Sequence, residues 1–153
     1  MKHDIIFEAL PCGKNSSEAY VRKCVERLCE NLNGMKDVTM LNIPEIVEEN
    51  HSGLPYYRNY DNRKFGLMLG KNCGKDLMIN TVASYKTKNE FTHWLDECIE
   101  KYGIKNFVFV GAKIERFKYP GDILVANSVA KSRSVNFGNI FIPDRHGESD
   151  RLI

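Results

Sequence analysis

The chain has 153 residues, of which 42% are hydrophobic, 10% aromatic and 27% charged, the composition of an ordinary soluble globular domain. Its 22 Lys and Arg residues against 20 Asp and Glu give a net charge of +2, too balanced for a protein that binds duplex DNA or an anionic bilayer. No apolar run approaches the ~18 residues of a membrane-spanning helix, and the first residues lack the apolar stretch of a secretion signal. We therefore expect one cytoplasmic domain over residues 1–153, with no nucleic-acid or membrane partner.

The amino-terminal half alternates between strand and helix patterns. A strand is predicted over Asp4–Ala9, and a helix over Ala19–Leu32 follows the capping residues 16–18 (Ser-Ser-Glu). A second strand is predicted over Val38–Ile43. The segment Pro44–Pro55 is expected to be an irregular, acid-rich loop, of the kind that often carries functional residues.

The carboxyl-terminal half continues the same alternation. Strands are predicted over Asp76–Ala83, Asn106–Gly111 and Asn139–Ile142. A helix is predicted over Phe91–Tyr102, because its apolar residues recur at the helical period and form one stripe for packing on a sheet. The last residues, Glu148–Ile153, resemble a helix start that stops after about one and a half turns. We therefore expect a chain truncated in its fifth helix.

The chain has five cysteines and no Cys-x-x-Cys motif. The cysteines are at positions 12, 24, 29, 73 and 98. This odd, widely spaced set predicts neither a disulfide framework nor a zinc site, so reduced thiols are expected. Cys24 and Cys98 fall among helical apolar positions, where a cysteine behaves as a small buried hydrophobe.

The predicted strands begin 30 to 38 residues apart, a spacing typical of right-handed βαβ units in a parallel α/β sheet. Two architectures fit: a partial TIM (β/α)₈-like barrel with about five strands, or a five-stranded doubly wound sheet such as a flavodoxin-like domain that binds FMN or a protein partner. A partial barrel leaves two sheet edges and an apolar interior uncovered. It would therefore associate, either as a homo-oligomer or with a second chain that completes the barrel.

Glu8 is the most informative ionisable residue, because it ends the first predicted strand just before a proline. Active sites of both architectures lie at the carboxyl ends of the strands. A carboxylate among apolar neighbours there would have a raised pKa, which suits a general acid. Asn42, Asn80 and His146 should converge on the same rim. The sequence contains no glycine-rich phosphate-binding motif and no metal-ligand set.

Four short motifs, in their order and spacing, resemble the methylenetetrahydrofolate reductase family. They are FEALP at residues 7–11, NIPE at 42–45, YGIKNFV at 102–108, and Ile142-Pro143 followed by His146. The resemblance implies a (β/α)₈ barrel, of which this chain covers about the first five-eighths. It also implies FAD, NADH or NADPH as electron donor, and reduction of methylenetetrahydrofolate to methyltetrahydrofolate.

The resemblance also assigns roles to individual residues. Glu8 matches the general acid that protonates a pterin nitrogen, and Asn42 is expected to contact the folate substrate. The residues expected to contact the flavin are Asn80, Tyr119, His146, Glu148 and Arg151.

One segment departs from the family pattern. Residues 110–113 read Val-Gly-Ala-Lys, where the family's fourth strand usually ends in Arg-Gly-Asp. The segment therefore has no carboxylate, and Lys113 brings a positive charge where the pattern expects a negative one. Two functions follow as alternatives: an oxidoreductase fragment or subunit that needs the rest of the barrel, or a non-catalytic subunit that binds folate or flavin or serves in assembly.

Overall fold

A five-stranded parallel sheet forms the centre of the protein in this computed structural model, which describes residues 5–49, 55–111 and 123–140. The sheet order is β1-β2-β5-β6-β7, with bounds Ile5–Glu8, Val38–Ile43, Asp76–Val82, Asn106–Val110 and Asn136–Asn139. Each strand pairs with the next parallel strand along the chain. A doubly wound sheet would instead start near its middle and wind outward in both directions. The prediction of parallel βα units is confirmed, and the doubly wound alternative is wrong.

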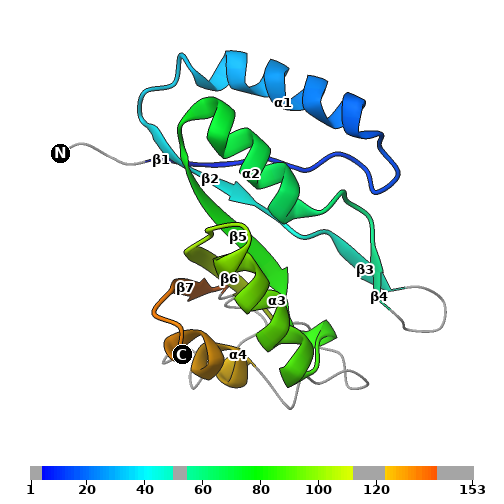
Figure 1. Ribbon diagram of the computed structural model, residues 1–153, viewed down its shortest axis with the longest axis vertical. Coiled ribbons are helices and arrows are strands. Elements are labelled where there is room, and N and C mark those ends of the chain that lie inside the picture. Colours follow the sequence, from blue (N-terminus) through cyan, green and yellow to red (C-terminus); the bar gives the residue numbers. More distant parts are fainter. Residues whose placement is uncertain (1–4, 50–54, 112–122, 141–153) are drawn as a thin grey trace.

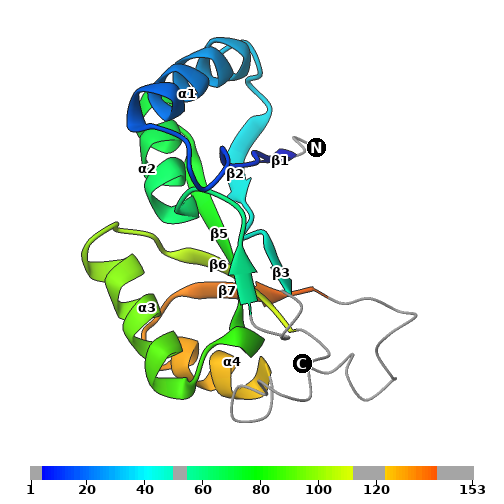
Figure 2. The same cartoon turned by 90° about the vertical axis from the view of Figure 1, so that its right-hand side faces the viewer.

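Four α-helices cover one face of this sheet, as in the wall of a barrel (Figure 2). They are α1 (Glu18–Leu32), α2 (Asn62–Cys73), α3 (Lys88–Glu100) and α4 (Ile123–Lys131), with a short 3₁₀ turn, η1, at Ala83–Tyr85. Among the residues described, no helix has the length and apolar character needed to cross a bilayer. The opposite face of the sheet, which we call the inner face, carries none of these helices.

Hydrogen bonds cap the starts of α1, as predicted at residues 16–18, and of α3. Ser17 accepts a hydrogen bond from the Tyr20 amide at 3.3 Å and begins α1. Thr87 accepts one from the Glu90 amide at 3.3 Å, and the Glu90 carboxylate accepts one in return from the Thr87 amide at 2.7 Å. This capping box starts the third helix at Lys88, three residues before the predicted Phe91.

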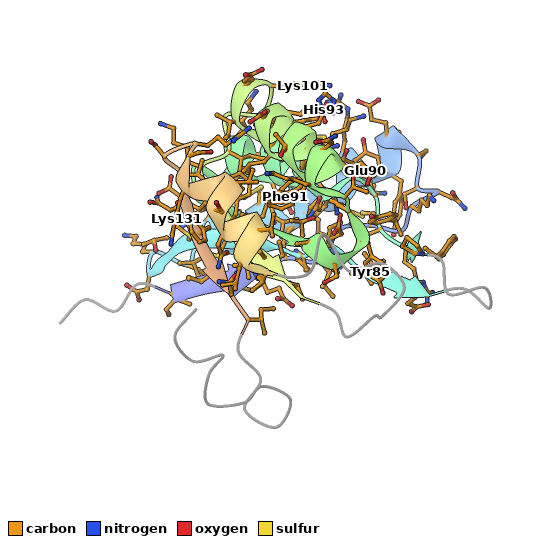
Figure 3. All side chains as sticks on the ribbon, turned by 90° about the horizontal axis from the view of Figure 1, so that it is seen from below. Tyr85, Glu90, Phe91, His93, Lys101 and Lys131 are labelled. Carbon is orange, nitrogen blue, oxygen red and sulfur yellow. A yellow bond between two sulfur atoms is a disulfide. The ribbon has the colours of Figure 1, made fainter. Side chains whose placement is uncertain are left out.

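The core lies between the sheet and the helices. Alternate residues of the strands, such as Ile43, Ile79 and Phe109, are fully buried on the helix-covered face. Figure 3 shows Phe91 inside, between α3 and α4, whereas His93 and Lys101 lie on the outer side of α3. The predicted apolar stripe of the third helix is therefore core.

The segment after β2 is more regular than expected. Where the sequence predicted an irregular loop, β3 (Val47–Glu49) and β4 (Pro55–Tyr57) pair as an antiparallel two-stranded ribbon. The ribbon extends beyond the carboxyl end of β2 (Figure 1). Three pairs of residues oppose each other across it, with Val47 opposite Tyr57. Cross-strand pairing stabilises these two short strands, although the Pro- and acid-rich composition of the segment is typical of a loop.

The fifth strand of the sheet also differs from the prediction. It runs over Asn136–Asn139, whereas the sequence favoured Asn139–Ile142, whose last two residues lie outside the described ones. Phe137 is aligned with Phe107 of β6 and stacks on Phe109 with ring centroids 5.6 Å apart. Aromatic packing on the core face thus sets the register of a strand that contains two Asn and a Gly.

The prediction of reduced thiols is wrong for one pair. Cys29 of α1 and Cys73 of α2 form a disulfide with Cα atoms 5.3 Å apart. The two helices pack side by side, and this packing brings together cysteines 44 residues apart in the sequence. Cys12, Cys24 and Cys98 are free. Cys98 is buried as predicted, but Cys24 is only half-buried.

Candidate functional site

Three of the predicted site residues share the inner face at the carboxyl ends of adjacent strands. Glu8 of β1 is aligned with Asn42 of β2, and Asn42 is aligned with Met78 of β5. Asn80 lies two residues beyond Met78 and therefore on the same face. Given the spacing of strands and the rise per residue, the Cα atoms of Asn42 and Asn80 are about 8 Å apart. The structure thus places these three residues in one small patch, the inner rim.

A hydrogen bond orients the Asn42 side chain. Its Nδ2 donates to Oε2 of Glu8 at 3.2 Å. A carboxylate only accepts hydrogen bonds, so the amide nitrogen faces Glu8 and Oδ1 of Asn42 points elsewhere. This Oδ1 is buried and has no hydrogen-bond partner in the described structure. It is a buried acceptor that no described donor satisfies.

Asn80 carries a second buried acceptor without a partner among the described residues. The residue is only 7% exposed, yet its Oδ1 has no hydrogen-bond partner in the described structure. A buried polar atom without a partner costs about 1–3 kcal/mol, so such atoms in folded proteins call for an explanation. An N–H group of a bound ligand would satisfy this oxygen.

Asn62, which sequence reasoning missed, fixes the backbone around Asn80. Its buried Nδ2 donates to the carbonyl oxygen of Asn80 at 2.8 Å and to that of Ile43 at 3.4 Å. It thereby links the ends of β5 and β2. Asp61 caps the helix that begins with Asn62, accepting from the amides of Arg63 and Lys64. Burial alone would raise the pKa of Asp61, but hydrogen bonds and charge from Arg63 outweigh burial and lower it.

An ion pair behind the rim also escaped the sequence analysis. Glu45 follows β2, and its Oε2 accepts from the Val82 amide at 2.7 Å and from the Thr81 hydroxyl at 3.0 Å. The Lys86 ammonium lies 3.3 Å from the same oxygen, and the two side chains are only 11% and 9% exposed. This cluster ties the segment after β2 to the end of β5. Glu45 is the last residue of the NIPE motif, but its lysine partner lies 41 residues away in the sequence, so the pair could not be predicted.

Tyr57 packs against this ion pair from the hairpin. Its ring centroid lies 5.6 Å from the Lys86 ammonium, a cation–π contact. Burial, and then the charge of Glu45, raise the pKa of Tyr57 to about 12. The phenol therefore stays protonated throughout the neutral range.

The structure can be compared with the prediction for Glu8 but not for the four site residues near the end of the chain. Glu8 is exposed rather than enclosed by other side chains. The four others, Tyr119, His146, Glu148 and Arg151, lie outside the described residues. The residues described also include no group of three or more His, Cys, Asp or Glu side chains arranged to hold a metal ion.

No protein-family model matches this sequence, and no curated protein matches it. A solved structure does match: an uncharacterized protein from Clostridium thermocellum, which binds two copies of 5-methyl-5,6,7,8-tetrahydrofolic acid. It superposes with a TM-score of 0.68 over 95% of this chain, at 20% sequence identity. The likeness is one of fold. This chain spans 46% of the length of that protein, less than two thirds.

Proposed function

We propose that the inner rim binds the pterin ring of a reduced folate such as 5-methyltetrahydrofolate. The observation that carries the proposal is the pair of buried, unpartnered oxygens on Asn42 and Asn80, beside the carboxylate of Glu8. A pterin presents N–H donors along one edge of a flat ring, and amide and carboxylate oxygens are acceptors for such donors. The fold shared with a protein that binds methyltetrahydrofolate supports the choice of ligand class.

The reaction proposed for this site is the reduction of methylenetetrahydrofolate, with Glu8 as the acid that protonates the pterin. Exposure of Glu8 to the inner rim leaves its carboxyl accessible to a bound ring. A flavin reduced by NADH or NADPH would supply the hydride for this reduction. The unpartnered oxygen of Asn80 could accept equally from a flavin ring N–H, so Asn80 fits either ring.

Turnover would require additional protein around the inner face. The outer edge of β1 is unpaired among the described residues, and Ile5 and Ile6 are 49% and 53% exposed. Unpaired strand edges and exposed apolar side chains favour association. We therefore propose a partner, either a second copy or a separate chain, that closes the barrel beside β1.

A non-catalytic folate-binding subunit is the second proposed function. It is favoured by the end of β6, where Val110 and Gly111 provide no carboxylate. An absorbance spectrum of the purified protein separates the two. A stoichiometric flavin band would favour the reductase, whereas a colourless protein that still binds folate would favour the binding subunit.

Replacing Asn80 by leucine tests the binding proposal. Asn80→Leu keeps the branched shape and the number of side-chain heavy atoms but removes the acceptor, so we expect affinity for 5-methyltetrahydrofolate, measured by calorimetric titration, to fall about 5- to 100-fold. Stability to urea should stay equal or rise, because an unsatisfied buried oxygen is lost. Asn136→Ala is the matched control, since Asn136 is an exposed asparagine near the opposite end of the same face. Unchanged affinity in Asn80→Leu would contradict the proposal.

A further inference from the structure

A depression lies beside the carboxyl ends of the strands. The loop after β1 and the β3–β4 ribbon line a shallow, open depression of about 330 Å³. Its lining residues are Gly13, Lys14, Asn15, Ser16, Tyr56 and Arg58. None of them was singled out by the sequence analysis. We call this depression the loop pocket.

The loop pocket is held together by main-chain hydrogen bonds. The Lys14 amide donates to the Arg58 carbonyl at 2.8 Å, and the Tyr60 amide donates to the Cys12 carbonyl at 2.7 Å. Between these bonds, Gly13 forms an antiparallel bridge with Asn59. The loop after β1 thus runs beside the segment after β4 as a short antiparallel pair. The cationic side chains of the pocket therefore project from a paired backbone.

The charge of the loop pocket is positive. Lys14 has no carboxylate partner among the described residues, and its ammonium lies 5.1 Å from the centroid of the Tyr56 ring. Arg58 pairs with Glu48 at 2.7 Å, but both side chains are 55% exposed. Such an exposed ion pair adds little stability, so Arg58 can exchange Glu48 for the carboxylate of a ligand. The start of α1 at Glu18 adds the positive end of a helix dipole.

We propose that the loop pocket binds the carboxylates of the folate's glutamyl tail, an inference that rests on the proposed function. Folate carries its pterin at one end and a glutamate with two carboxylates at the other. Gly13 follows Glu8 by five residues, which limits the distance between the pocket and the inner rim to about 18 Å. One elongated ligand can therefore have its ring at Glu8 and its anionic end between Lys14 and Arg58. An arginine and a lysine are the usual partners of carboxylates.

The test compares three ligands and three proteins by calorimetric titration. The ligands are 5-methyltetrahydrofolate with one glutamate, the same folate with three glutamates, and 5-methyltetrahydropterin, which has no glutamyl tail. The proteins are the wild type, the Lys14→Ala/Arg58→Ala double variant, and Lys23→Ala, in which an exposed lysine of α1 outside the pocket is removed. We expect the double variant to bind the monoglutamate about tenfold more weakly and the triglutamate more weakly still. Its affinity for the pterin should equal that of the wild type, and Lys23→Ala should bind all three ligands normally.

The outcomes distinguish this inference from the proposed function. If the wild type binds neither pterin nor folate, the proposed function fails, and this inference fails with it. If the wild type binds the folates but the double variant binds them equally well, only the tail site is overturned. If free glutamate alone binds the wild type as tightly as the monoglutamate folate does, the pocket serves a free anion and the inference is overturned. Equal unfolding temperatures of the three proteins would confirm that the variants are folded.

Discussion

Phe109→Ala is expected to lower the free energy of unfolding by about 3–5 kcal/mol, the usual cost of truncating a buried phenylalanine. Phe109 of β6 is fully buried, and three rings surround it. Its ring centroid lies 5.1 Å from that of Phe91, 5.6 Å from that of Phe137 and 6.1 Å from that of Phe107. These rings belong to α3, to the neighbouring strand β7 and to β6 itself, so the truncation would leave a cavity where several elements meet.

Urea unfolding measures this effect, with the fluorescence of the single tryptophan, Trp94, as the signal. Trp94 lies in the same aromatic cluster, 5.9 Å from Phe107 between ring centroids. Met35→Ala is the control, because Met35 is 45% exposed and its truncation should cost little. A loss below about 1 kcal/mol for Phe109→Ala would contradict the described core.

Glu45→Leu should also lower the free energy of unfolding by about 3–5 kcal/mol, because it leaves the largely buried Lys86 ammonium without its carboxylate partner. The Val82 amide and the Thr81 hydroxyl would lose an acceptor in the same step. These groups join the segment after β2 to the end of β5, next to the inner rim. Loss of Glu45 should therefore weaken folate binding as well as stability.

A second substitution separates the charge from the other contacts. Lys86→Met removes the unpaired ammonium, so the double variant Glu45→Leu/Lys86→Met should be more stable to urea than Glu45→Leu alone. The double variant should remain below the wild type, since the Val82 amide stays unsatisfied. If the double variant were less stable than Glu45→Leu, the two side chains would not form the buried pair described.

The strands β2, β5 and β6 could be predicted from the sequence to within a residue at each end. Each is a short, β-branched or aromatic run followed by a clear turn, so local propensity and tertiary packing agree. The helices α1 and α3 were predicted for the same reason, because their caps and apolar periods coincide.

The bounds of helix α2 were not predicted, and its glycines explain why. Gly66 and Gly70 lower helix propensity. In the structure they allow the helix to lie close to the sheet, because a Cβ at Gly66 would meet side-chain atoms of Ile43 and Ile79 at 3.1 Å. A Cβ at Gly70 would meet Leu77 at 2.9 Å. Close packing, which only the tertiary structure reveals, compensates for the low helix propensity of these two glycines.

The inner rim could be predicted in part. The positions of Glu8 and Asn42 at strand ends follow from the parallel alternation, and the register confirms that they are neighbours. The unpartnered oxygen of Asn80 and the distant partners of Asn62 and Glu45 could not be predicted, because they depend on which groups lie within hydrogen-bond distance after folding. The disulfide was missed for a similar reason, since it needs the packing of α1 on α2.

The most direct test of the folate site is an NMR titration of the ¹⁵N-labelled protein with 5-methyltetrahydrofolate. We expect the largest chemical-shift changes in the backbone amides around Glu8 and in the side-chain amides of Asn42 and Asn80. A larger depression of about 600 Å³ at the opposite end of the sheet, lined by Lys75, Gly103 and other residues, provides the internal control. Signals there should not move. Shifts confined to that opposite end, or no shifts at millimolar folate, would contradict the proposed site.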